Sequence, residues 1–119
     1  TISATGVAGL TLGGGVGWLA GKHGLACDNL RSVDIVTADG QLRRASAEEN
    51  ADLFWALRGA GANFGVVTSF EFALHPVGPM IYGGLLLHPI DLAAEVWRFY
   101  REFAAKQADE LTTAAAVLT

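Results

Sequence analysis

Glycine is concentrated near the amino end of this chain. Residues 6–24 contain eight of the 15 glycines in the 119-residue sequence. A glycine inside a helix or strand costs about 0.5–1 kcal/mol relative to alanine, because it loses more backbone freedom on folding. Such a dense run is typical of backbone that takes positive φ angles or lies close against a flat or anionic group. We interpret residues 6–24 as one wall of a cofactor site.

The composition of the chain excludes several classes of protein and partner. Hydrophobic residues make up 51% of the chain, which is enough for a folded core and argues against disorder. The formal net charge is −4 and the eight basic residues are scattered, so we expect no nucleic-acid partner. A single cysteine gives no internal disulfide and no metal-ligand spacing. No apolar run reaches the roughly 18 residues of a membrane span, so no membrane partner is expected.

The amino-terminal part reads as a series of short elements. Residues 7–12 predict a short buried strand that runs into the glycine turn, and residues 16–22 allow two helical turns at most. Residues 33–45 predict a β-hairpin, because the Asp39-Gly40 pair at their centre favours a type I′ turn.

A helix and a third strand are predicted to follow the hairpin. Ser46 and Glu49 have the spacing of a capping box, in which each side chain accepts a hydrogen bond from the other residue's backbone amide. Gly59 lies where a helix-terminating glycine belongs. A second glycine-containing loop spans residues 58–65, and residues 66–74 predict a strand.

The remaining residues predict the beginning of a second domain. We place the boundary near residue 78, so that residues 1–77 form one part and residues 78–119 another. Strands are predicted at residues 80–87 and 111–118. Between them lies a predicted helix, capped by Asp91, whose apolar residues repeat with a helical period: Leu92, Val96, Phe99, Tyr100 and Phe103.

The ends of the sequence predict a fragment of a larger protein. The chain begins at Thr1 without a methionine and ends inside the last predicted strand. We expect the apolar surface at these edges to favour self-association of the isolated chain.

Three interpretations of the glycine run stay open on the residues alone. The first is a turn without a ligand. The second is a dinucleotide-binding turn of a parallel α/β fold: residues 15–20 match G-x-G-x-x-A and Asp39 follows about 20 residues later, but Gly21 and Gly24 interrupt the required helix. The third is a flavin cradle, because successive backbone amides of a glycine turn bind anions without a charged side chain.

Six blocks of the sequence carry a family resemblance. They are residues 6–17 (GVAGLTLGGGVG), 22–25 (KHGL), 28–30 (DNL), 36–40 (VTADG), 52–59 (DLFWALRG) and 63–68 (NFGVVT). In this order they resemble FAD-linked oxidases of the vanillyl-alcohol-oxidase and p-cresol-methylhydroxylase (PCMH) type, with berberine-bridge-enzyme-like oxidases as the nearest branch. The resemblance covers about residues 3–76, and the following residues resemble the start of that family's substrate domain.

The resemblance implies a fold and a reaction class. The fold would be α+β: a PCMH-type FAD-binding subdomain with a mixed or antiparallel sheet and flanking helices. The reaction would be oxidation of an alcohol, sugar or amine carbon by hydride transfer to flavin, with oxygen as the second substrate. The family's catalytic base would lie beyond Thr119, so no catalytic residue is assigned and the chain alone is expected to be inactive.

The resemblance also implies cofactor contacts, residue by residue. The pyrophosphate and ribityl chain would be lined by Ser3, Thr5, Gly6, Gly9 and Thr11. Four glycines would pass close to the flavin: Gly13, Gly14, Gly15 and Gly17. The second loop would approach the cofactor through Asn63, Phe64, Gly65 and Val66, with the Val66 backbone near the adenine.

Two departures from the family pattern bear on the comparison. Many relatives attach the flavin through a histidine and a cysteine. The histidine would lie upstream of this chain, and the cysteine position holds Ile2, so we expect no cysteinyl bond. Leu10 stands where plant members often carry histidine.

Other polar and aromatic residues are predicted to be structural. Cys27 reads as a small buried apolar residue. Asp28 and Asn29 are expected to cap a turn, and His23 to be exposed. Turn positions are expected for His75 and His88, and core packing for Trp18, Trp55 and Trp97.

Overall fold

The computed structural model describes residues 4–118. The chain divides into two units, Thr1–His75 and Pro76–Thr119, and each is described by itself. The assignment of residues 1–77 to a cofactor-binding domain and of residues 78–119 to a substrate domain stays a prediction.

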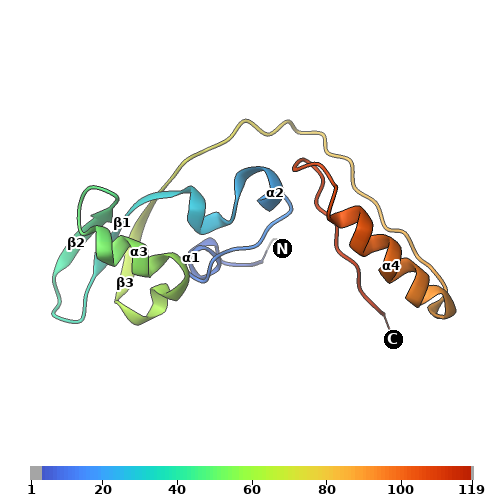
Figure 1. The fold of residues 1–119 in the computed structure, drawn as a ribbon. Coiled ribbons are helices and arrows are strands. Elements are labelled where there is room, and N and C mark those ends of the chain that lie inside the picture. The colour runs from blue at the N-terminus through green and yellow to red at the C-terminus, as the bar shows by residue number, and fades with distance from the viewer. Residues whose placement is uncertain (1–3, 119) are drawn as a thin grey trace. The chain divides into compact units, whose positions relative to one another are not determined.

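The first unit is built on a three-stranded antiparallel sheet in the order β2-β1-β3 (Figure 1). Its strands are β1 (Leu30–Val36), β2 (Leu42–Ser46) and β3 (Val66–Phe72). Val33 in the central strand lies opposite Ala45 of β2 and Phe70 of β3. The predicted hairpin and the strand after the second glycine loop are therefore present.

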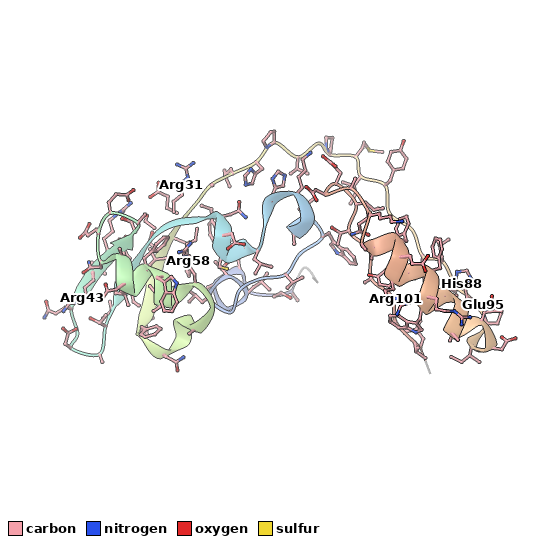
Figure 2. The ribbon with its side chains drawn as sticks, viewed as in Figure 1. Arg31, Arg43, Arg58, His88, Glu95 and Arg101 are labelled. Atoms are coloured by element: carbon pink, nitrogen blue, oxygen red, sulfur yellow. The ribbon has the colours of Figure 1, made fainter. Side chains whose placement is uncertain are left out.

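The turn between β1 and β2 differs from the predicted type I′ turn. A type I′ turn needs positive φ at both central residues. Here Gly40 has φ +75, whereas Asp39 does not have a positive φ. The Gly40 amide donates to the carbonyl of Thr37 at 2.8 Å, and the Thr37 amide donates to the carbonyl of Gln41. This is the longer hairpin loop that ends in a left-handed glycine. Arg43, at the hairpin in Figure 2, closes it with a 2.7 Å hydrogen bond to the Asp39 carboxylate.

Helix α3 (Ala51–Ala60) covers one face of the sheet and completes the core. The buried cluster consists of Leu30, Val33, Ile35, Ala45, Phe54 and Leu57. Val33 and Ile35 lie on one face of β1, two residues apart, and Phe54 and Leu57 lie three residues apart on one face of α3. Leu30 joins them across a register shift at the start of β1. Burial of this small core is what holds the first unit together.

The capping of α3 is only partly as predicted. The Ser46 hydroxyl accepts from the Glu49 amide at 3.1 Å, but the reciprocal bond runs from the Ser46 amide to the Glu49 backbone carbonyl rather than to its side chain. The helix begins later, at Ala51, after Asn50 with φ +48. Regular helical geometry ends before Gly59, whose φ of +129 needs glycine, as predicted.

The predicted strand at residues 7–12 is wrong: these residues form helix α1 (Val7–Leu12). The amide of Leu10 donates to the carbonyl of Gly6, and the amide of Gly13 donates to the carbonyl of Gly9. Thr11 is buried and Leu12 packs against the core, whereas Val7, Ala8 and Gly9 are exposed. A six-residue apolar run fits either element by length, and here the local helical hydrogen bonds decide.

Three further short helices complete the first unit. They are α2 (Ala20–His23), η1 (Ala26–Asn29) and η2 (Gly61–Asn63). Residues 16–22 thus provide one short turn of helix, within the predicted limit of two.

The second unit contains one long helix. η3 (Ile90–Leu92) leads into α4 (Ala93–Ala104), as the helical period predicted. Asp91 makes no capping hydrogen bond, and the predicted strands at residues 80–87 and 111–118 are extended chain that no other described strand joins. The segment after α4 is tied back by a 3.0 Å hydrogen bond from the Tyr100 hydroxyl to the Thr113 carbonyl.

The prediction that three tryptophans pack in the core is wrong for the described residues. Trp18 is 62% exposed, Trp55 74% and Trp97 43%. Trp55 lies on the side of α3 that faces away from Phe54 and Leu57, and the apolar face of α4 has no second layer within its unit. Within residues 4–118, no helix is long and apolar enough to cross a bilayer.

Candidate functional site

Four glycines of the amino-terminal run present bare backbone to open space. A Cβ atom built on Gly6, Gly9, Gly14 or Gly17 would meet no described atom within 4 Å, apart from immediate chain neighbours and α1's own backbone. Packing within the described unit therefore gives no reason for glycine at these positions, and backbone conformation gives one only at Gly14, whose φ is +108. A ligand that lies against the backbone is such a reason, because a side chain would hold it away.

Other glycines of the run are explained by the fold itself. A Cβ on Gly15 would lie 2.5 Å from the Cβ of Ala26, and Gly15 also has φ +85. A Cβ on Gly13 would lie 3.3 Å from the carbonyl oxygen of Gly9. The glycine run therefore serves two purposes, close packing on η1 at Gly15 and open backbone around it.

The carbonyl groups of this turn are held by η1. The amide of Ala26 donates to the carbonyl of Gly15, and the amide of Cys27 donates to the carbonyl of Gly14, both at 2.9 Å. In a trans peptide the N–H of the next residue points opposite to the carbonyl. The Gly15 amide therefore points away from η1.

The second glycine loop packs directly on the first. A Cβ on Gly61 would come within 2.7 Å of the Leu12 side chain in α1, so glycine at 61 lets the two segments touch. Gly65 has φ +147, and a Cβ there would lie 2.2 Å from the carbonyl oxygen of Val36. Phe64 packs against the core beside it. Gly61 and Gly65 thus bring the loop against α1 and β1.

The polar residues predicted to contact the cofactor differ in solvent exposure and in hydrogen bonding. Thr5 is exposed, next to the open Gly6. Thr11 is fully buried, and its hydroxyl oxygen has no hydrogen-bond partner among the described residues. Asn63 is exposed and donates to the carbonyl of Ala60 at 2.9 Å. The predicted contact at Ser3 falls outside the described residues.

A shallow cavity of about 210 Å³ lies beside the turn. It is lined by Leu10, Gly15, Val16, Gly17, Leu19, Ala20, Gly24, Ala26 and Asn29. Gly15 and Gly17 were predicted to be in the site, whereas Asn29 was predicted only to cap a turn. The position of Asn29 just before a predicted strand did not indicate that this residue would lie beside the glycine turn.

The polar residues around η1 are mainly structural. The Leu25 amide donates to the Asp28 carboxylate at 2.8 Å, and the Asn29 side chain also bonds locally, so both residues fix a turn as predicted. Burial and the neighbouring Asp28 carboxylate raise the pKa of the Cys27 thiol, which stays protonated. Among residues 4–118, no group of three or more His, Cys, Asp or Glu side chains is placed to hold a metal ion.

His23 is not exposed as predicted, because it stacks on the ring of His75. The two ring centroids lie 4.0 Å apart with an interplanar angle of 14°. Its burial, together with the neighbouring His75 and Lys22, lowers the pKa of His23 below 6.5. The contact joins the end of the glycine segment to the residues that follow β3.

Comparison with known proteins identifies a matching family. A sequence family described as FAD binding domain matches residues 1–46. An FAD-linked oxidoreductase of Aspergillus terreus, pgmH, is 56% identical over 88 residues, which are 74% of this chain and 18% of that protein. Another FAD-linked oxidoreductase, azaL of Aspergillus niger, is 40% identical over 117 residues, covering 97% of this chain and 25% of that protein.

A solved structure gives the same result for the fold. The xylooligosaccharide oxidase of Myceliophthora thermophila, in complex with xylobiose, is 57% identical, with a TM-score of 0.56 over 57% of this chain and 14% of that one. The chain thus spans a quarter or less of the length of each of these relatives.

The alternative of a parallel dinucleotide-binding fold is wrong. Helix α1, not a strand, precedes the glycine turn, and Asp39 belongs to a hairpin between antiparallel strands. The open backbone at Gly6, Gly9, Gly14 and Gly17 fits a cofactor held through main chain. With the α+β fold, the family match and the relatives, this places the chain in the superfamily of FAD-linked oxidases of the vanillyl-alcohol-oxidase and PCMH type, as part of their FAD-binding domain.

Proposed function

We propose that this chain is the FAD-facing part of an oxygen-dependent oxidase that acts on an alcohol, sugar or amine. The observation that supports this most is the row of glycines whose open side is not used by packing. The xylooligosaccharide oxidase among the similar structures favours a sugar as the first substrate to test. Bound FAD would supply the redox chemistry by accepting a hydride from the substrate carbon.

The chain's own contribution is to hold and orient the cofactor. Thr5, Gly6 and Gly9 lie together at the start of α1 and would contact the pyrophosphate and ribityl chain, where a hydroxyl and bare backbone suit an anionic, flexible group. Gly14 and Gly17 would let the flat ring approach the main chain. Ser3 and Thr11 stay predicted contacts, as do Gly13 and Gly15.

The second loop would complete the cofactor-binding surface. η2 packs on α1 through Gly61 and ends at Asn63, and the next residues are Phe64, Gly65 and Val66. The Val66 backbone, at the first residue of β3, is the proposed adenine contact. Residues 78–119 are proposed to begin the substrate domain.

The attachment of the flavin follows from one residue. Ile2 offers no thiol, so we propose that no cysteinyl bond forms, whatever histidine the rest of the protein provides. Acid denaturation followed by filtration tests this: flavin that stays with the protein would be bound through another residue.

The proposed function is tested on the full-length protein that carries this chain. We expect it to purify yellow, or to become so with added FAD, and to release peroxide with an oligosaccharide, a primary alcohol or an amine. A protein that stays colourless and binds no added FAD would refute the flavin site. Bound FAD with no peroxide from any of these substrates would refute the oxidase activity alone.

The isolated 119-residue chain is a separate case. Its second unit exposes large apolar side chains, including Tyr82 at 108%, Leu86 at 86% and Met80 at 88%. We propose that this chain alone is inactive and self-associates, because such side chains are normally buried. Light scattering that finds only monomer, or peroxide release by the isolated chain, would contradict this.

A further inference from the structure

The side chain of Asn29 joins the turn before η1 to the segment that follows β3. Its amide nitrogen donates to the carbonyl of His23 and to the carbonyl of Leu25, both at 2.8 Å. Its amide oxygen accepts from Nε2 of His75 at 2.5 Å. Both N–H groups and the oxygen of one side chain are therefore used, which fixes its orientation.

The backbone around Asn29 is fixed at the same place. The Ala73 amide donates to the Asn29 carbonyl at 2.8 Å, so the residues after β3 run beside η1. The ring of His75 lies flat on His23. A side chain on Gly24 would come within 2.9 Å of the Asp28 carboxylate, so this turn has little room to move.

A short path of hydrogen bonds leads from Asn29 to the glycine turn. Asn29 holds the carbonyl groups of residues 23 and 25, immediately before η1. The next two amides, those of Ala26 and Cys27, hold the carbonyls of Gly15 and Gly14. Asn29 also lines the cavity that Gly15 and Gly17 line.

We propose that Asn29 is a positioning residue for the cofactor-facing glycine turn, and that His75 sets the orientation of Asn29. This inference rests on the proposed function, since it needs FAD to lie against the turn. Asn29 acts through η1: its bonds keep η1 in the place from which the Ala26 and Cys27 amides orient the Gly14 and Gly15 peptides. Loss of those bonds loosens the turn without removing a core side chain.

The experiment uses the full-length flavoprotein and four variants. Asn29→Ala removes the three side-chain bonds. His75→Ala removes the donor to Asn29, and His75→Gln keeps an N–H group at a similar reach. Asn50→Gly is the matched control: it removes one side-chain bond to a backbone carbonyl, that of Arg44 at 2.7 Å, and glycine suits the φ of +48 there.

Two signals are measured on each protein. The first is the visible circular dichroism of the bound flavin. The second is the difference between the temperature at which flavin fluorescence rises and the temperature at which the protein unfolds. For Asn29→Ala we expect a changed flavin spectrum and at least about a tenfold larger population with exposed flavin before unfolding, because more than one hydrogen bond is lost. His75→Ala should show a smaller effect, and His75→Gln and Asn50→Gly should resemble the parent protein.

The outcomes separate the possible failures. If both temperatures fall together in Asn29→Ala while the flavin spectrum is unchanged, the residue is only structural and the proposal is overturned. An unchanged Asn29→Ala protein, or no rescue by His75→Gln of a defect in His75→Ala, also overturns it. A parent protein without flavin, even after FAD is added, refutes the proposed function instead.

Discussion

Replacing Gly9 by alanine should change protein stability and cofactor binding in opposite directions. Gly9 lies inside α1, and a Cβ there would meet no atom within 4 Å outside its own helix. Alanine is favoured over glycine in a helix by about 0.5–1 kcal/mol, so the free energy of unfolding without FAD should rise by up to that amount. No described contact opposes this gain.

The same methyl group should weaken FAD binding. If the cofactor lies against α1, it must move to make room for the methyl group, and misfits of this size cost about 1–3 kcal/mol. At 1.4 kcal/mol per factor of ten, the dissociation constant should rise by about 5- to 150-fold. The assay pairs urea denaturation of the apoprotein with titration of flavin fluorescence.

Two further glycines make the test decisive. Gly15→Ala should lower stability as well as binding, because its Cβ would lie 2.5 Å from that of Ala26. Gly84→Ala, in the second unit and equally open, should leave FAD binding unchanged. Unchanged FAD binding by Gly9→Ala, or a loss of stability without FAD, would refute the idea that α1 presents bare backbone to the cofactor. Gly14 is less suitable, because its φ of +108 makes any side chain costly in itself.

Three other predictions follow from the first unit. Gly65→Ala should lower the free energy of unfolding by about 2–6 kcal/mol, because it adds backbone strain and an overlap with the Val36 carbonyl. Gly59→Ala adds strain alone and should lower it by about 1–3 kcal/mol. Equal losses for the two variants in urea denaturation would contradict this. Because the pKa of His23 is lowered in the folded state, its contribution to stability is complete above the ordinary value of 6.5 and is lost as the pH falls below it. The melting temperature should therefore fall as the pH drops below 6.5, and should fall less in His23→Gln. Hydrogen bonds from Thr37, Arg43 and the Gln41 amide lower the pKa of Asp39 from 3.8 to about 2, so its contribution should disappear as the pH falls through that interval, and Asp39→Asn should remove this part of the acid transition.

Signals that depend on neighbouring residues predicted the fold well. The Asp39-Gly40 pair gave the hairpin, Gly59 gave the end of α3, and the apolar period gave α4. Residues 7–12 were assigned to the wrong element because a short apolar run does not distinguish a strand from a helix. The predicted strand at residues 80–87 is absent, because a strand needs a partner strand and the described residues supply none there.

The site was less predictable than the fold. The glycine run marked the right segment, but the sequence could not separate Gly15, which packs on Ala26, from Gly9, which faces open space. That distinction depends on where η1 folds back, and η1 is held by Asn29 and His75, which lie 46 residues apart in the chain. Contacts between residues so far apart in the chain leave no local pattern in the sequence.

The two outer strands of the sheet differ in how they resist further pairing. β2 carries Arg43 and Arg44 along an edge that no described strand covers, and cations on an edge discourage the addition of another chain. β3 carries one charged residue, Glu71, among mostly apolar neighbours, so it is the edge strand that can pair more readily with another strand. Any additional strand that extends this sheet, whether from the same polypeptide or from another molecule, should therefore join beside β3.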